Sequence, residues 1–184
     1  ERGGIWRNRG RAPQKLTGVG FTTQGFDACH PYYRMPDSYH KSVSWIFDGV
    51  EGEKFGDHGL ALGGAAGLET ERYDLLLGTP PHTKLLGSST NWSDNYPGVH
   101  EDIMFHHPGL LGTQNPAVRA DMTYFTAGNN GAVFSTGSIA WTSALPSFGY
   151  ENDVARITKN ILDAFSKPGE LPGGAWTEDE KSWR

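Results

Sequence analysis

The pattern of apolar and polar positions predicts one clear helix toward the C-terminal end of the chain. Apolar side chains recur at spacings of three and four residues from Val154 to Phe165, which places them on one face of a helix. Acidic and amide side chains at residues 151–153 favour a helix start, and the proline and glycine within residues 167–169 end it. Because the other face is polar, we expect this helix to pack on a sheet.

Shorter apolar runs rich in β-branched and aromatic residues predict strands between glycine- and proline-rich turns. The predicted strands occupy residues 16–21, 42–50, 84–89 and 120–126. Residues 128–131, Gly-Asn-Asn-Gly, predict a hairpin turn, and residues 132–145 supply further strand and loop. Residues 26–40 contain two prolines and six aromatic or histidine rings, so we expect a long aromatic loop there.

Composition narrows the class of protein. The 184 residues fit one domain, and 25 Gly with 11 Pro indicate a loop-rich chain rather than a helical bundle. The net charge of -5 excludes a basic nucleic-acid footprint, and no apolar run approaches the ~20 residues of a membrane span. The single cysteine, Cys29, excludes an internal disulfide framework. We therefore expect a cytoplasmic protein and, from the abrupt start at Glu1, the C-terminal piece of a longer polypeptide.

Residues 59–74 are the strongest candidate for chemistry. Five very small residues at 63–67 precede a group of charged side chains, namely Glu69, Glu71, Arg72 and Asp74. A carboxylate that follows such a loop can be partly buried, which raises its pKa and suits it to proton transfer. The alternative is a tight turn whose charges are solvated or form ion pairs.

Cys29 and His30 together raise the hypothesis of a thiol nucleophile. Adjacent side chains of an extended segment point to opposite sides, and the base in such sites normally comes from elsewhere in the sequence. We therefore interpret Cys29 as a small buried hydrophobic residue.

A second group combines histidines with carboxylates, as a zinc or non-haem iron centre requires. Its members are His100, Glu101, Asp102, His106 and His107. No His-Glu-x-x-His motif is present, and two adjacent histidines cannot both face one metal from a regular element without strain. Ordinary loop histidines are the favoured interpretation.

Several motifs together resemble a known family. They lie at residues 3–11, 18–22, 65–74, 77–82 and 131–141 and span nearly the whole chain. The last of them, followed by an amphipathic helix, is the most specific. The chain resembles the C-terminal part of the large (beta) subunit of the N,N-dimethylformamidase family.

This resemblance implies a fold, an activity and a cofactor. The implied fold is an α/β, glutamine-amidotransferase-like domain of the flavodoxin-like three-layer type, with residues 1–169 as its C-terminal part and residues 170–184 as a docking tail. The implied activity is hydrolysis of N,N-dimethylformamide to dimethylamine and formate by a bacterial hetero-oligomer with a small partner subunit. A mononuclear iron, held by two tyrosines and a glutamate upstream, is also implied, so no metal ligand is assigned here.

The same resemblance assigns Glu69 as the catalytic carboxylate beside the iron. Iron would act as a Lewis acid or lower the pKa of bound water, while Glu69 accepts the water's proton and returns it to the leaving amine. Glu71 is the second candidate, because next-but-one residues of an extended segment share a side. Its alternative role is an ion pair with Arg72 or another cation. Cys29 lacks the flanking glycines of an amidotransferase elbow, which argues against a thiol mechanism.

Two other functions remain open at this stage. A carbohydrate-related domain of the same superfold would use the aromatic residues 31–39 to line a sugar site. A non-catalytic assembly domain would instead make subunit contacts through Trp176, Trp183 and the arginines at positions 7, 9 and 11.

Overall fold

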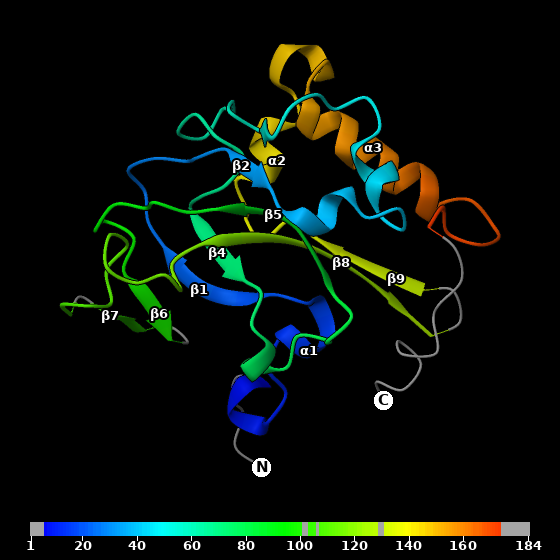
Figure 1. Cartoon of the computed structure of the whole chain (residues 1–184). Helices are drawn as coiled ribbons and strands as arrows, with labels where there is room; N and C mark the ends of the chain where they lie inside the picture. The colour runs from blue at the N-terminus through cyan, green and yellow to red at the C-terminus, as the bar shows by residue number, and fades with distance from the viewer. Residues whose placement is uncertain (1–5, 101–102, 106, 129–130, 174–184) are drawn as a thin grey trace.

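Two antiparallel sheets form the centre of the protein, as seen in a computed structural model that describes residues 6–100, 103–105, 107–128 and 131–173 (Figure 1). The strands are β1 (Gly20–Gln24), β2 (Tyr32–Arg34), β3 (Lys54–Phe55), β4 (Glu69–Arg72), β5 (Lys84–Ser89), β6 (Gly98–His100), β7 (Ile103–Phe105), β8 (Ala120–Ala127) and β9 (Gly131–Ser135). The four-stranded sheet has the order β4-β1-β6-β7, and the five-stranded sheet has the order β3-β2-β5-β8-β9. Each sheet therefore combines pairs of consecutive strands, such as β6-β7 and β8-β9, with strands distant in sequence.

The helices are few and short. The α-helices are α1 (Gln14–Thr17), α2 (Trp141–Ala144) and α3 (Asp153–Phe165). The 3-10 helices are η1 (Trp6–Arg9), η2 (Pro36–Tyr39), η3 (Ser44–Phe47), η4 (Leu75–Leu77) and η5 (Ser147–Tyr150). Within the described residues, no helix has the length and apolar character needed to cross a membrane.

The predicted α/β class is confirmed in its broad sense, whereas the specific fold is not. Every strand pairing described here is antiparallel. A flavodoxin-like layer consists of parallel strands joined by crossover helices. The described part of the chain shows two antiparallel sheets instead, so it does not confirm the glutamine-amidotransferase-like arrangement.

The five-stranded sheet confirms two predicted strands and the hairpin. The predicted run 84–89 is β5, and the run 120–126 is β8 with one further residue. β8 pairs with β9 in antiparallel register, and Ala127 is opposite Gly131. The two asparagines of the predicted turn lie outside the described residues, but the strands that flank them establish the hairpin.

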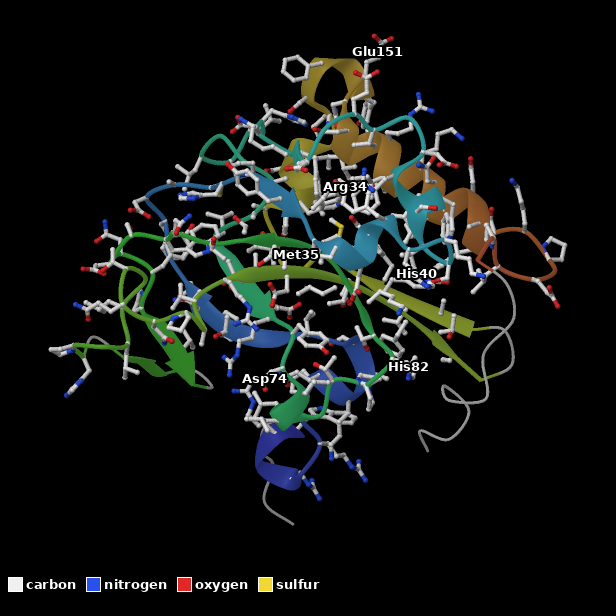
Figure 2. The ribbon with its side chains drawn as sticks, in the orientation of Figure 1. Arg34, Met35, His40, Asp74, His82 and Glu151 are labelled. Atoms are coloured by element: carbon white, nitrogen blue, oxygen red, sulfur yellow. The ribbon has the colours of Figure 1, made fainter. Side chains whose placement is uncertain are left out.

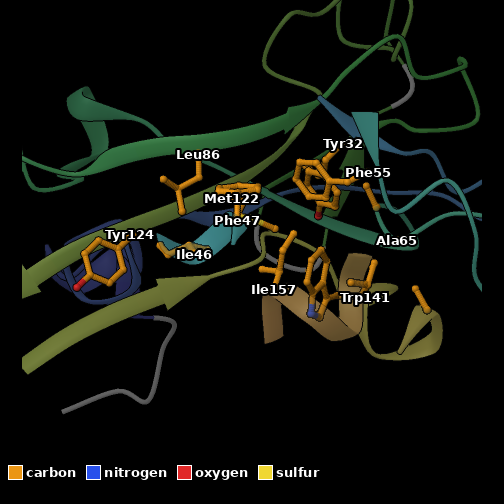
Figure 3. Packing of buried hydrophobic residues seen from close by; sticks show 14 of the residues in the cluster. Tyr32, Ile46, Phe47, Phe55, Ala65, Leu86, Met122, Tyr124, Trp141 and Ile157 are labelled. Atoms are coloured by element: carbon orange, nitrogen blue, oxygen red, sulfur yellow. The ribbon is translucent and has the colours of Figure 1, made fainter. Parts of the chain in front are cut away.

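The predicted C-terminal helix is α3, and it covers one face of the five-stranded sheet. The Asn152 side chain caps its start by accepting a hydrogen bond from the amide of Ala155 at 2.8 Å. Its buried face consists of Val154, Ile157, Ile161 and Ala164. In Figure 3, Ile157 lies beside Trp141 and faces Met122 of the sheet, so the helix forms part of the core, as expected.

The predicted strand at residues 42–50 is wrong, because the centre of this run forms the 3-10 helix η3. Val43, Ile46 and Phe47 are all buried in the core cluster. Their spacing of three and four residues fits one face of a helical turn, and the amide of Ile46 bonds to the Val43 carbonyl at 3.0 Å. β-Branched and aromatic residues favour strands only as far as tertiary packing allows.

Two further predictions are partly wrong near the N-terminal end. The run 16–21 begins inside α1, and Gly18 at φ +80° ends that helix before β1 starts at Gly20. The run 26–40 is not one loop, since it contains β2 and η2. Pro36 is the first residue of η2, a position where a missing amide hydrogen costs nothing.

Candidate carboxylate site

Glu69 and Glu71 lie on the same side of β4. Thr70 between them is fully buried, so the two glutamates alternate with it and face the opposite way. Both line a hollow of about 370 Å³, called here the carboxylate hollow. Its other lining residues are Thr17, Phe21, Phe134, Ser135, Thr136, Gly137, Ser138 and Ile139. The prediction that Glu71 shares the side of Glu69 is confirmed.

Hydrogen bonds hold the backbone of both glutamates from two edges. On one edge β4 pairs with β1, with Glu69 opposite Gln24 and Glu71 opposite Phe21. On the other edge the amide of Glu71 donates to the Gly137 carbonyl at 2.8 Å, and the amide of Ile139 donates to the Glu69 carbonyl at 3.4 Å. The segment after β9 therefore forms the facing wall of the hollow.

The small residues before Glu69 are required by close backbone packing, as their composition suggests. A Cβ on Gly64 would lie 2.6 Å from backbone atoms of Cys29 and His30. Ala66 pairs with His30 across an isolated bridge and is fully buried. Any larger side chain at position 64 would displace the main chain it rests on.

The two glutamates differ in their surroundings. Glu69 is exposed at the mouth of the hollow, whereas Glu71 is half-buried. Burial raises the pKa of Glu71, and the nearby negative charge of Glu69 raises it further. A carboxyl group with a raised pKa exchanges protons closer to neutral pH, which favours a role in acid-base chemistry.

Arg72 does not neutralise either glutamate. Its guanidinium group pairs with Asp74 at 2.8 Å and donates to the Thr22 hydroxyl at 2.6 Å. Among the described residues, no cation forms an ion pair with Glu69 or Glu71. The ion-pair alternative for Glu71 therefore finds no partner in this part of the chain. Asp74 has a structural role, since it also caps η4.

A buried carboxylate that the sequence analysis missed joins the two sheets. Asp121 of β8 is fully buried and accepts hydrogen bonds from the Ser88 hydroxyl at 2.7 Å, Arg119 Nε at 2.7 Å and the amide of Tyr73 at 2.9 Å. Burial raises its pKa, and the charge of Arg119 acts in the opposite direction. One signal was available, namely a charged residue inside an otherwise strand-like run.

Cys29 is a small buried residue, as predicted. Its side chain packs on Gly67, where a Cβ would lie 2.4 Å from the sulfur atom. Burial raises the pKa of the Cys29 thiol, which keeps it protonated and unreactive. His30 stacks on Trp92, with ring centroids 4.4 Å apart. The two side chains thus serve packing rather than nucleophilic chemistry.

The predicted group of metal-ligand types can be placed only in part. Glu101, Asp102 and His106 lie outside the described residues, and His100 ends β6. His107 Nδ1 lies 2.8 Å from the carbonyl oxygen of Pro108. Within the residues that are described, no three histidine, cysteine, aspartate or glutamate side chains come together to hold a metal ion.

The aromatic residues of segment 31–39 do not share one surface. Tyr32 is fully buried in the core, and its hydroxyl donates to the Thr136 carbonyl at 2.7 Å. The guanidinium carbon of Arg34 lies over the rings of Tyr39 and Phe47, 4.0 and 4.3 Å from their centroids, and Figure 2 shows Arg34 in the upper half of the molecule, below Glu151. Tyr32 is therefore not accessible for stacking on a sugar ring.

Comparison with known proteins assigns the sequence to a family. A family profile described as N,N-dimethylformamidase beta subunit-like, C-terminal, matches residues 1–155. The chain is 48% identical over 172 residues to the N,N-dimethylformamidase beta subunit of Paracoccus aminophilus and 46% identical over 172 residues to that of an Alcaligenes species. Each match covers 93% of this chain and 23% of the relative, so the chain spans about a quarter of their length. The chain belongs to the N,N-dimethylformamidase beta subunit family and corresponds to its C-terminal part.

Proposed function

We propose that this chain forms part of an N,N-dimethylformamidase and supplies a proton-transferring glutamate to its amide-hydrolysing site. The observation that carries the proposal is the pair of carboxylates, Glu69 and Glu71, on one side of β4 in the carboxylate hollow. Both residues lie within the segment matched by the family profile. The activity of the complete enzyme, conversion of N,N-dimethylformamide and water to dimethylamine and formate, is part of this proposal.

Glu69 is the proposed general base and acid. As a carboxylate it takes one proton from the attacking water, whose oxygen then bonds to the carbonyl carbon of the amide. The protonated Glu69 gives this proton to the nitrogen, and the carbon–nitrogen bond breaks. The amine leaves with the proton, because an unprotonated dimethylamide ion is a very poor leaving group. Glu69 ends the cycle as a carboxylate.

Iron fits this chain only as a group held by other residues. Glu69 and Glu71 present two carboxylates, and no third ligand-type side chain joins them within the described residues. As the family resemblance implies, we place the iron ligands upstream of this chain. When bound there, iron supplies Lewis-acid polarisation of the amide carbonyl or of water. The contribution of this chain is proton transfer.

The hollow requires a further wall, which we assign to the remainder of the large subunit. Glu69 is exposed at its mouth, and Ile139 on its rim is 52% exposed. The relatives are named beta subunits, which supports an enzyme with more than one kind of subunit.

We further propose that residues 1–169 are the C-terminal part of a glutamine-amidotransferase-like domain and that residues 170–184 form a docking tail. Most of that tail lies outside the described residues.

Glu71 is the second candidate for the same role. Its raised pKa, caused first by burial and then by Glu69, favours it as the carboxyl that holds a proton near neutral pH. The resemblance of sequence motifs favours Glu69. Separate substitutions distinguish the two, because only the residue that transfers the proton needs an ionisable group.

The test uses the complete enzyme with Glu69→Gln and, separately, Glu71→Gln. Loss of the acid-base group lowers kcat by about 10²–10⁴-fold while metal content and subunit assembly stay unchanged. Glu151→Gln is the control, since Glu151 is exposed and lies at the end of the molecule opposite Asp74 (Figure 2). It should retain full activity.

The outcomes separate three functions. If Glu69→Gln and Glu71→Gln both keep kcat within a few-fold of the unsubstituted enzyme, the catalytic role is wrong and an assembly domain is favoured. A loss only in Glu71→Gln transfers the role to Glu71. Turnover of glycosides in place of amides would support the carbohydrate-related alternative.

A further inference from the structure

We propose that Ser138 and Tyr96 are positioning residues. Their hydroxyl groups fix the backbone at Gly67 and Leu68, and this sets the direction of the Glu69 carboxylate. The inference rests on the proposed function, because it assigns a purpose to the direction of Glu69. The two hydroxyls are called here the hydroxyl clamp.

The clamped backbone has an unfavourable conformation. Gly67 has φ +149° and Leu68 has φ +63°, so two successive residues depart from the conformations that side chains prefer. For leucine this left-handed conformation crowds the Cβ against the following carbonyl oxygen. Such a conformation persists only where surrounding contacts determine it, and it occurs often at functional sites. Glu69 follows directly and starts β4.

Ser138 holds Gly67 on one side. Its hydroxyl donates to the Gly67 carbonyl at 2.9 Å, and it accepts from the amides of Gly67 at 2.8 Å and Ala140 at 3.1 Å. A serine hydroxyl has one donor and two acceptor positions, so these contacts use its full capacity. Ser138 lines the carboxylate hollow but has no proton left to share with a substrate. Its role is therefore positional rather than nucleophilic.

Tyr96 holds Leu68 from another part of the fold. Its hydroxyl accepts from the amide of Leu68 at 3.1 Å and donates to the Ala28 carbonyl at 2.5 Å. The ring is fully buried and packs on Trp92, with centroids 4.4 Å apart. Burial raises the pKa of Tyr96, so the group remains a neutral hydroxyl donor. The two side chains thus fix the Ala66–Gly67 and Gly67–Leu68 peptide groups, while the carbonyl of Leu68 accepts from the backbone amide of Gly25 at 2.8 Å.

The clamp acts on Glu69 more directly than on Glu71. The Glu71 amide is held separately by the carbonyl of Gly137 at 2.8 Å. The backbone of Glu69 keeps its contacts with β1 and Ile139 when the clamp is lost, so only the Gly67–Leu68 peptide group relaxes, and its rotation carries the Glu69 carboxylate away from Glu71. Greater separation weakens the repulsion by which Glu69 adds to the raised pKa of Glu71, so the step of the pH profile that reports Glu71 moves to lower pH.

The test compares Ser138→Ala and Tyr96→Phe in the complete enzyme. We expect kcat to fall by about 10- to 100-fold with KM nearly unchanged, because misplacement by about 1 Å has effects of this size. The step of the pH profile that reports Glu71 should shift to lower pH. Ser138→Thr keeps the hydroxyl and should restore much of kcat, and Tyr96→Phe keeps the buried ring so that the fold is retained.

Thr158→Val is the matched control. The half-buried Thr158 hydroxyl on α3 also makes two hydrogen bonds, donating to Val154 O at 2.8 Å and accepting from Trp141 Nε1 at 3.1 Å. This variant should lose stability but keep kcat and the pH profile. A general effect of losing buried hydroxyls would appear in all three variants alike.

A double variant separates the failure of the clamp from the failure of the proposed function. Ser138→Ala should lower kcat no further once Glu69→Gln is present, because it acts through Glu69. If Glu69→Gln disables the enzyme while Ser138→Ala and Tyr96→Phe keep normal kcat and pH profile, the clamp is overturned and the function stands. Losses that multiply in the double variant also overturn the clamp. An active Glu69→Gln enzyme overturns both.

Discussion

The two faces of β8 are both buried, but by different kinds of interaction. On one face Ala120, Met122 and Tyr124 join the apolar cluster beneath α3, which Figure 3 shows from close by. On the other face Asp121 and Thr123 are fully buried toward the four-stranded sheet. One strand therefore separates an apolar core from a polar layer, and β4 with its two glutamates lies in the polar layer.

The apolar side is held by packing that does not depend on direction. Tyr32, Phe55 and Trp141 lie with ring centroids between 5.5 and 6.5 Å apart. Neighbouring aliphatic side chains fill the spaces between these rings. Such a core tolerates substitutions that conserve volume.

The polar side is held by directed hydrogen bonds. The single side chain of Asp121 on β8 accepts hydrogen bonds from Ser88 of β5, from Arg119 and from the amide of Tyr73 at the end of β4. A Cβ on Gly137, which has φ +71°, would lie 2.3 Å from the carbonyl oxygen of Asp121, so the wall of the hollow rests directly on β8. Hydrogen bonds therefore fix the backbone of a site built on this layer, and substitutions that remove a donor or acceptor there should be poorly tolerated.

The largest effect should follow from Asp121→Ala. This change leaves Arg119, Ser88 and the amide of Tyr73 without their buried acceptor, so we expect a loss of about 3–5 kcal/mol in the free energy of unfolding. Denaturant unfolding of the complete subunit measures it. Asp163→Ala is the control, since its pair with Lys159 is solvent-exposed and should matter little. Equal effects of the two changes would show that the polar layer is not held by Asp121.

A smaller effect is expected on the apolar face of the same strand. Met122→Ala should cost about 2–5 kcal/mol through the cavity it leaves, whereas Met122→Leu should cost less than about 1.5 kcal/mol. The same unfolding measurement applies. If Met122→Leu proved as damaging as Met122→Ala, the core would depend on specific shape, and the contrast between the two faces would disappear.

The sequence predicts the apolar side better than the polar side. Apolar patterning identifies α3 by its periodicity and β5 and β8 as short apolar runs, because each of the three elements buries apolar side chains. It fails at η3, where Val43, Ile46 and Phe47 fit both a strand and a helical turn. The one signal for Asp121, a charged residue inside a strand-like run, normally indicates a solvent-facing position and so does not reveal its burial.

The candidate site was predictable only as a segment. Glu69 comes from the resemblance of motifs, and Glu71 from alternation along an extended chain. Ser138 and Tyr96 could not be found in this way, because they contact residues 71 and 28 positions away in sequence. Their hydroxyls reach Gly67 and Leu68 only after folding brings these three segments of the chain together.

The smallest predicted effect is a gain in stability rather than a loss, and it concerns Glu71. Its folded-state pKa is raised, so its contribution to stability is greatest below its ordinary pKa and is lost as pH rises through the raised value. At neutral pH the half-buried carboxylate therefore destabilises the fold, and Glu71→Gln should raise the melting temperature of the complete subunit. The gain should vanish near pH 4, where protonated Glu71 resembles glutamine. Glu151→Gln, which changes an exposed side chain, should leave the melting temperature nearly unchanged at pH 7. A Glu71→Gln protein that melts lower at pH 7 would contradict the burial of a charge that no described cation pairs with.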